Sequence, residues 1–381
     1  MTLSPQPLPL LTRMPPQGPA PCCPAAEPLG DPMAQPFVMG ALDTPAGPAP
    51  RVSGQLSPAD RRGTLRVRWD IGRHDYKVVP GLYALNNPTP DSPVLVSANY
   101  KLSFDHLREA ARELDAWLLV LDTKGVNVWC AAGKGTMGTA ELAGRVRSSG
   151  LERVVSHRRL ILPQLAAPGV AAHLVKKQCG FGVVYGPVMA RDLPAFLAKG
   201  HKADPAMRRV RFPLRARAVL VPVELMQALK TYLWLLPSLL LLAGLGGLVG
   251  GLGFWAGLGG AGLRAVGAML LALVAGAVAS PLLLPWLPGR AFSLKGLWPG
   301  LAGAALLWAP WPGAAWPPSA ELMAWCLAVP ALSSFLAMNF TGASTYTSLS
   351  GVKKEMRRAV PLQIAAAAIG LGLWLYALVA A

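Results

Sequence analysis

The spacing of apolar residues changes near residue 230 of this 381-residue chain. Before that point, apolar runs are short and are separated by charged residues, glycine and proline, as in a soluble α/β domain. After it, five apolar segments each approach the roughly twenty residues that a helix needs to cross a bilayer. These segments lie at about 231–252, 263–287, 296–316, 321–340 and 360–380. The pattern therefore predicts a soluble domain followed by an all-α transmembrane domain with five helices.

Strands and helices alternate in the soluble part. Buried strands are predicted at 94–98 and 117–122, because both runs are short, apolar and bounded by turn residues, and 104–114 between them has helical spacing. Two strands joined by a helix form a right-handed crossover unit with parallel strands. Further strands are expected at 64–69, 76–79, 160–162 and 181–185, and further helices at 139–148, after 168–169 and near 192–199. We therefore expect an α/β domain with a mostly parallel, Rossmann-like sheet.

Composition divides the chain into four regions. Residues 1–62 are rich in Pro, Gly, Ala and Ser and are predicted to be a disordered tail, because they bury too little apolar surface to offset chain entropy. Residues 63–205 form the α/β domain, and 231–381 the transmembrane domain. Between them, 206–230 is a basic juxtamembrane connector that binds anionic lipid headgroups or an acidic ferredoxin, and its sequence does not separate these partners. Its arginines are Arg208, Arg209, Arg211, Arg215 and Arg217.

Charge and composition support a membrane protein. Hydrophobic residues make up 53% of the chain and charged residues 14%, which is unusual for a soluble protein. The net charge of +17 is spread along the soluble part and the loops, without the basic, aromatic-bearing face that nucleic-acid binding requires. Loops 288–295 and 341–359 carry most of the loop charge. The positive-inside rule then predicts a multi-pass protein of the inner (cytoplasmic) membrane, with a cytoplasmic soluble domain and the C-terminus outside.

The cysteines form no recognisable metal or disulfide framework. Five are present, without a CxxC pair, and the odd count fits a reducing cytoplasm. They are Cys22, Cys23, Cys130, Cys179 and Cys326. The adjacent pair in the tail has no role that the sequence defines, Cys179 is expected to pack in the core, and Cys326 falls within a predicted span.

Cys130 stands out by its position. It lies just beyond the carboxyl end of the predicted strand 117–122, where open α/β sheets bind their ligands. The small residues that surround it would allow the backbone to approach a large, flat molecule. They are Ala131, Ala132, Gly133 and Gly135. We therefore predict that Cys130 faces a cofactor.

Several common sites do not fit this stretch. A phosphate loop would need glycine at Val128 and serine or threonine at Gly135. The sequence has no DxHxxG motif, by which many cobalamin proteins supply a histidine to cobalt, and no closely spaced cysteines for an iron–sulfur cluster. A nucleophilic pair of Cys130 with a histidine stays open. The candidate histidines are His106, His157 and His173.

Four further polar residues lie near the ends of predicted strands and helices. They are Ser97, Asn99, Thr136 and Thr139. Such residues line a cofactor or cap the neighbouring helices, and the sequence leaves both roles open.

Residues 127–136 read Asn-Val-Trp-Cys-Ala-Ala-Gly-Lys-Gly-Thr. This stretch resembles the signature of the HgcA family, the membrane-bound corrinoid proteins of microbial mercury methylation. The soluble domain of that family is similar to the corrinoid domain of the corrinoid iron–sulfur protein of acetogens. The resemblance extends over about residues 65–381, with supporting stretches at 79–85, 97–101, 121–125, 161–170 and 339–342.

The resemblance implies a cobalamin-type corrinoid bound base-off, with Cys130 as the lower axial ligand of cobalt. Residues 127–136 would then form a cap helix on the lower face of the corrinoid. The implied contact residues are Asn127, Val128, Trp129, Cys130, Ala131, Ala132, Gly133, Lys134, Gly135 and Thr136. Because a thiolate donates more electron density than imidazole, a methyl group on cobalt should become easier to lose to an electrophile.

By the same resemblance, the activity is that of a corrinoid-dependent methyltransferase, which carries a methyl group on cobalt and transfers it to inorganic Hg(II) to give methylmercury. The chain has no cluster motif of its own, so cobalt would be reduced by a ferredoxin-like partner with two 4Fe–4S clusters. The methyl group would come from a folate-linked methyltransferase.

Two alternatives remain at this point. In the first, the corrinoid protein carries methyl groups for one-carbon metabolism or for another metal or metalloid acceptor. In the second, the chain is a membrane transporter whose cytosolic domain regulates it without a cofactor. The paucity of ionisable residues inside the predicted spans disfavours transport.

Overall fold

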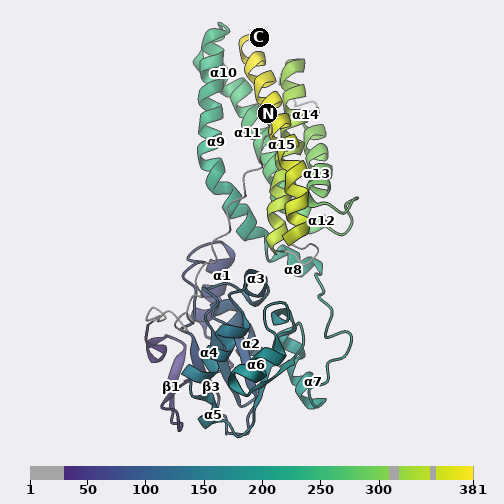
Figure 1. The fold of residues 1–381 in the computed structure, drawn as a ribbon. Coiled ribbons are helices and arrows are strands. Elements are labelled where there is room, and N and C mark those ends of the chain that lie inside the picture. Colours follow the sequence, from purple (N-terminus) through teal and green to yellow (C-terminus); the bar gives the residue numbers. More distant parts are fainter. Residues whose placement is uncertain (1–29, 309–316, 344–348, 381) are drawn as a thin grey trace, which may run out of the picture.

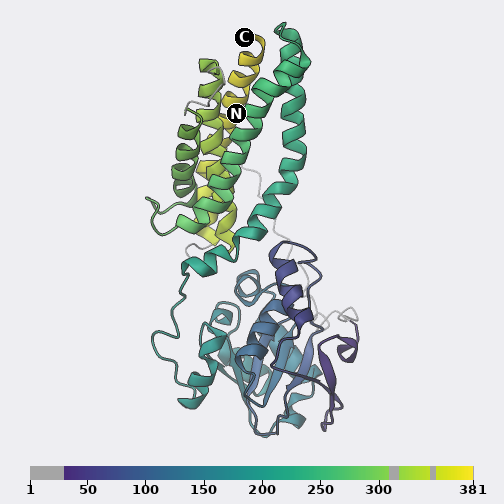
Figure 2. The same ribbon diagram turned by 180° about the vertical axis from the view of Figure 1, so that it is seen from behind.

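The computed structural model describes residues 30–308, 317–343 and 349–380, which form an α/β domain and a bundle of long helices (Figure 1). The two parts predicted from the apolar pattern are therefore present. The segment between the last helix of the α/β domain and the bundle runs along the outside of the domain, as both views show (Figure 2).

Seven strands form one mixed sheet in the order β1-β2-β3-β5-β4-β6-β7. Their bounds are β1 Val38–Leu42, β2 Ala49–Val52, β3 Gly81–Leu85, β4 Val94–Ala98, β5 Ala116–Leu121, β6 Arg159–Leu162 and β7 Gly182–Tyr185. Four of the six pairings are parallel, and β1–β2 and β3–β5 are antiparallel. The predicted α/β domain with a mostly parallel sheet is confirmed, including the strands predicted at 94–98, 117–122, 160–162 and 181–185.

Helices cover both faces of this sheet, because successive side chains of a strand point to opposite faces. In β5, Leu119 and Leu121 pack into the core beneath α4 and α6, whereas Leu118 and Val120 pack beneath α2 and α7. The helices of this domain are α1 Pro58–Arg68, α2 Lys101–Ala110, α3 Val128–Lys134, α4 Thr139–Ser148, α5 Leu151–Val154, α6 Ala172–Cys179 and α7 Leu193–Ala198. Short 3₁₀ turns lie at η1 Pro32–Ala34, η2 Gln164–Ala166 and η3 Ala190–Asp192.

The N-terminal boundary differs from the sequence prediction. A tail was expected up to residue 62, but β1 and β2 lie in that region and extend the sheet. The strand predicted at 64–69 is also wrong, because these residues belong to α1. Residues 76–79 form a single bridge between Lys77 and Tyr100 rather than a strand. Residues 1–29, with Cys22 and Cys23, lie outside the described residues.

Helix α1 begins at a capping box. The Ser57 hydroxyl accepts a hydrogen bond from the backbone N–H of Asp60, and the Asp60 carboxylate accepts one from the backbone N–H of Ser57. This reciprocal cap satisfies two backbone donors and favours a helix where the alternation of polar and apolar residues suggested a strand.

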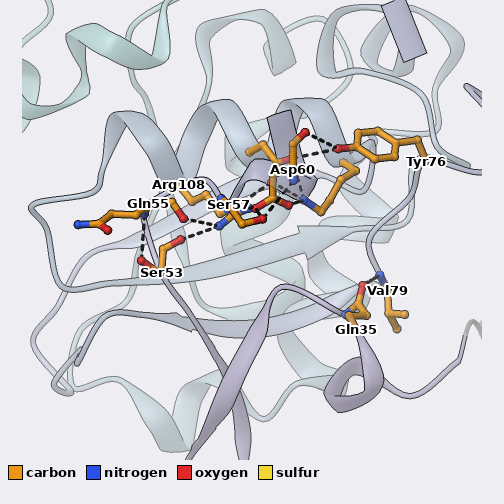
Figure 3. Close-up of polar contacts among 10 residues, drawn as sticks. Gln35, Ser53, Gln55, Ser57, Asp60, Tyr76, Val79 and Arg108 are labelled. Carbon is orange, nitrogen blue, oxygen red and sulfur yellow. Dashed lines mark hydrogen bonds and ion pairs between the residues drawn. The ribbon is translucent and has the colours of Figure 1, made fainter. Parts of the chain in front are cut away.

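A buried cluster of charges joins α1 to α2 (Figure 3). The Lys101 ammonium lies 2.7 Å from Asp60 Oδ1 and 2.6 Å from Asp105 Oδ1, and Arg108 Nη2 lies 2.7 Å from Asp60 Oδ2. Burial acts to raise the pKa of Asp60, but the hydrogen bonds from Lys101 and Arg108 hold that pKa far below its ordinary value. Tyr76 lies beside the cluster, where burial and then the charges of Asp105 and Asp60 raise its pKa to about 12.

The C-terminal part is all α, as predicted. Its helices are α8 Leu214–Ala218, α9 Val221–Val249, α10 Phe254–Gly257, α11 Leu263–Leu273, α12 Ser280–Leu283, α13 Phe292–Leu306, α14 Ser319–Asn339 and α15 Leu349–Ala380. The π-helical segments Leu258–Gly262 and Val274–Ala279 join α10, α11 and α12, and a 3₁₀ turn, Phe340–Ala343, follows α14.

Four helical stretches among the described residues are long and apolar enough to cross a membrane. They are Leu214–Val249, Phe254–Leu283, Ser319–Asn339 and Gly351–Ala380. The remaining predicted span, 296–316, coincides in part with α13. Its residues 309–316 lie outside the described residues. The segment predicted as a connector, 206–230, contains α8 and the first turns of α9.

Glycines allow these helices to approach closely. A Cβ on Gly247 of α9 would lie 2.7 Å from the Cα of Gly257 in α10, so only glycine fits there. Small residues at such contacts are common where helices pack within a membrane.

Candidate cofactor site

A cavity of about 960 Å³ lies between the α/β domain and the helical bundle. It is bounded by residues at the carboxyl ends of β4, β6 and β7, where open α/β sheets bind ligands. Small-molecule sites commonly enclose roughly 300–1,000 Å³, so this cavity accommodates a large cofactor. Most of its lining from the α/β domain is apolar, including Leu95, Ile161, Leu162 and Val188.

The N-terminal half of α3 forms one side of this cavity. Asn127, Val128, Trp129 and Cys130 all line it, and the tryptophan and cysteine side chains are half-buried. The Oδ1 atom of Asn127 accepts a hydrogen bond of 2.9 Å from the backbone N–H of Cys130. Asn127 thus caps the helix, and the cap fixes the backbone of Cys130 at the cavity wall.

The rest of the predicted 127–136 contact set does not line the cavity. Ala131 and Ala132 are buried beneath α3, Gly133 and Lys134 are exposed, and α3 ends at Gly135 in a left-handed conformation with φ of 83°. The remaining member, Thr136, directs its hydroxyl back toward the carbonyl of Ala131. The structure therefore brings four of the ten predicted contact residues to the cavity.

Asn99 holds the loop that leads into α3. Its side chain is fully buried, and its Oδ1 atom accepts hydrogen bonds from Thr123 N, Thr123 Oγ1 and Gly125 N at 3.1, 2.8 and 2.9 Å. Its own backbone carbonyl accepts a hydrogen bond from Val78 N. Asn99 therefore neither lines the cavity nor caps a helix, the two roles that the sequence left open, and instead holds this loop in place.

Close backbone packing holds the other end of α3. A Cβ at Gly169 would lie 3.0 Å from the Cα of Ala132 and would clash with the carbonyl oxygen of Met137. Nearby, the Thr139 hydroxyl accepts a hydrogen bond of 2.9 Å from Ala171 N, so this threonine also has a structural role. Ser97, in contrast, lines the cavity.

The far wall of the cavity comes from the helical bundle. Leu220, Glu224 and Gln227 of α9 line it, together with Asn339 at the end of α14. Sequence reasoning missed these residues. The available signal was Glu224 and Gln227, which lie three residues apart on one face of a mostly apolar helix.

The other candidate residues are distributed as follows. His106 and Arg73 line the same cavity as Cys130, whereas His157 contacts the carbonyl of Ser92 and His173 does not line the cavity. Cys179 packs against the core, as expected, with its thiol donating to Val175 O at 3.3 Å. In the bundle, Trp308 Nε1 lies 3.2 Å from the Cys326 sulfur.

Comparison with known proteins identifies a class for the α/β domain. Residues 71–197 match the family model of the CO dehydrogenase/acetyl-CoA synthase delta subunit. This region contains β3 to β7, α3 and the cavity wall that the α/β domain supplies.

Individual relatives match the same region. The acetyl-CoA decarbonylase/synthase complex subunit gamma of Archaeoglobus fulgidus is 30% identical over 141 residues, which is 36% of this chain and 30% of that protein. The corresponding subunit of Methanopyrus kandleri is 33% identical over 130 residues, or 33% of this chain and 28% of that protein. The subunit of Methanocaldococcus jannaschii is 35% identical over 97 residues, or 25% of this chain and 20% of that protein.

The chain thus spans less than a third of the length of these relatives. The matches support a corrinoid-domain protein of the methyl-carrying type, and they do not single out the HgcA family.

Proposed function

We propose that this chain is a membrane-bound, corrinoid-dependent methyltransferase that uses Cys130 as an axial ligand of cobalt and Hg(II) as its methyl acceptor. One observation carries the proposal. The half-buried thiol-bearing residue Cys130 lines a cavity of about 960 Å³ in a domain similar to acetyl-CoA decarbonylase/synthase subunits.

The residues of the cavity fit a corrinoid. Cys130 would hold the metal of the cofactor through its thiol. Val128 and Trp129 add an apolar surface beside it, and Leu95 and Ile161 exclude water from the strand ends.

When bound, the corrinoid supplies a cobalt ion that accepts a methyl group and gives it up again. The protein's part is to place the Cys130 sulfur and to hold it there. The Asn127 cap fixes the backbone of Cys130, and the Asn99 hydrogen bonds fix the loop before it. A thiolate at this position would favour loss of the methyl group to an electrophile.

The identity of the methyl acceptor is inferred from sequence resemblance. The match of 127–136 to the HgcA family supports Hg(II) as substrate. The similarity to acetyl-CoA decarbonylase/synthase subunits supports a second candidate, a methyl carrier for one-carbon metabolism.

The proposal includes the partners and the orientation that the sequence implied. A ferredoxin-like protein with two 4Fe–4S clusters would reduce the cobalt, and a folate-linked methyltransferase would supply the methyl group. The four apolar helical stretches anchor the chain, with the α/β domain on the cytoplasmic side.

The test uses the full-length protein in detergent, reconstituted with a corrinoid. We expect a visible spectrum that changes in Cys130→Ala and stays unchanged in the matched thiol control Cys179→Ala, which lies outside the cavity. Identical spectra for wild type and Cys130→Ala would refute the axial ligand.

The acceptor is tested by mixing methylated holoprotein with Hg(II) and measuring methylmercury by mass spectrometry. Cys130→Ala should lower the rate at least about tenfold, the low end of what perturbing a metal's ligand environment costs. Transfer to a one-carbon acceptor but not to Hg(II) would replace the first candidate with the second.

A further inference from the structure

The cavity that contains Cys130 is bounded on one side by the helical bundle. Glu224 and Gln227 lie about one turn apart near the start of α9, and Asn339 ends α14. Figure 1 shows α3 at the end of the α/β domain that faces α8 and the lower end of α9. Residues far apart in the sequence, 127–130 and 220–227, therefore share one cavity.

An ion pair fixes this arrangement. Lys230 Nζ lies 2.6 Å from Asp70 Oδ2, and the Asp70 side chain is only 5% exposed. Asp70 follows α1 and has a φ of 60°, which directs its carboxylate from a tight turn toward α9. Lys230 is about two turns beyond Glu224 on α9, so the pair holds this end of the helix against the α/β domain.

The chemistry of the two walls differs. The α/β domain contributes mainly apolar side chains, together with the charged Arg73, Glu109 and Arg191. The bundle adds the Glu224 carboxylate and the amides of Gln227 and Asn339. A corrinoid matches this division, because its ring has apolar faces and its rim carries acetamide and propionamide side chains. Carboxylates accept hydrogen bonds from amide N–H groups, and amides both donate and accept them.

We propose that Glu224, Gln227 and Asn339 bind the amide side chains on the rim of the corrinoid, so that the membrane domain completes the cofactor site. This inference rests on the proposed function, because it takes the corrinoid as the ligand. It assigns the membrane domain a part in cofactor binding in addition to anchoring.

The experiment compares two probes in full-length protein incorporated into lipid nanodiscs. Cobinamide carries the rim amides and no nucleotide, and heptamethyl cobyrinate carries esters in place of those amides. Esters lack the N–H donors that a carboxylate requires. We therefore expect wild type to bind cobinamide at least about tenfold more tightly than the ester, as measured by absorbance titration.

The variant Glu224→Ala/Gln227→Ala should lose most of this preference and bind cobinamide about 10- to 30-fold more weakly. Glu224→Gln and Asn339→Ala should each weaken cobinamide binding about fivefold. These single variants replace the double variant in the test if the double variant does not fold. Glu113→Ala, an exposed carboxylate outside the cavity, is the matched control and should bind like wild type. The visible spectrum of bound cobinamide should be the same in all of these proteins, since Cys130 is unchanged.

The outcomes separate the two proposals. The inference would be overturned if the α9 and α14 variants preferred cobinamide over the ester as strongly as wild type does. The proposed function would stay intact if the visible spectrum of the bound corrinoid still depended on Cys130. Failure of wild type to bind cobinamide or cobalamin would overturn both.

Discussion

Among individual residues, Asn99 supports the candidate site without lining it. One buried amide oxygen accepts three hydrogen bonds from Thr123 and Gly125, and these residues begin the loop before α3. A buried donor that loses its partner keeps the full cost of its desolvation. The position of Cys130 therefore depends on Asn99.

We predict that Asn99→Ala destabilises the α/β domain by about 2–4 kcal/mol, because it leaves the buried backbone N–H of Thr123 and the half-buried backbone N–H of Gly125 without their acceptor. Corrinoid affinity should fall with it. Thermal unfolding followed by circular dichroism measures the first effect, and absorbance titration the second. Ser148→Ala, at an exposed hydroxyl, is the control. A melting temperature equal to that of wild type would contradict the role of Asn99.

Sequence reasoning placed Cys130 beyond the carboxyl end of the strand at 117–122, and the structure has it nine residues after β5, in α3 at the cavity wall. Sequence reasoning could not assign Asn99, since the partners of this amide lie 24 and 26 positions away and meet it only after β4 and β5 pair in parallel. The same applies to Ala131 and Ala132, whose burial depends on which face of α3 meets the core.

At the scale of elements, the position of α3 depends on close packing beside Gly169. Gly169→Ala would place a Cβ against the backbone of Ala132 and Met137, so α3 must shift. We predict a loss of about 1–3 kcal/mol in stability and weaker corrinoid binding. Gly144→Ala, inside α4 where nothing lies within 4 Å of the added Cβ, should be neutral or stabilising. Equal behaviour of the two variants would exclude a close-packing role for Gly169.

The charged cluster between α1 and α2 predicts a pH dependence. The pKa of Asp60 is far lower in the folded protein than the ordinary aspartate value of about 3.9 in the unfolded chain. Its contribution is therefore present above about pH 4 and is lost as pH falls through the folded pKa. Asp60→Asn should cost about 3–5 kcal/mol near pH 7, because Lys101 and Arg108 lose a buried partner.

The measurement is the difference in unfolding midpoint between wild type and Asp60→Asn from about pH 7 to about pH 3. This difference should shrink toward the acid end, whereas Glu113→Gln, at an exposed carboxylate, should show none. A difference that stays constant with pH would argue against the ionised Asp60 as its source.

Local patterns predicted most elements of the α/β domain and failed at its N-terminal end. Alternation at 64–69 suggested a strand, but the Ser57 cap and the contacts of Asp60 with Lys101 and Arg108 stabilise a helix. The strands in 38–52 gain their stability from pairing with each other and with β3, a long-range contribution that composition does not reveal.

On the scale of the whole molecule, the apolar pattern predicted the division into two parts, because long apolar runs need no tertiary information. It did not predict their contact. Asp70 and Lys230 lie 160 positions apart, and no local sequence pattern predicts that they pair. The cavity lies between the same two parts, and the proposed share of α9 in cofactor binding depends on their contact.

The contact between Asp70 and Lys230 can be weakened without disturbing the turn that carries it. Asparagine, like aspartate, adopts positive φ more readily than most residues other than glycine, so Asp70→Asn removes the charge and keeps the backbone at 60°. We expect corrinoid release from Asp70→Asn to be several times faster than from wild type in stopped-flow absorbance, because α9 is held less firmly against the cavity. The spectrum of the bound cofactor should not change, since Cys130 lies on the opposite wall.

Salt provides a second readout of the same contact. Lys230 is 64% exposed, so ions should screen its attraction to Asp70. Release from wild type should therefore speed up with ionic strength, and release from Asp70→Asn should respond less. Lys199→Ala removes an exposed ion pair with Asp204 within the α/β domain and should leave both rates unchanged. If salt accelerates release equally in wild type and Asp70→Asn, the ion pair does not hold the helical bundle over the cavity.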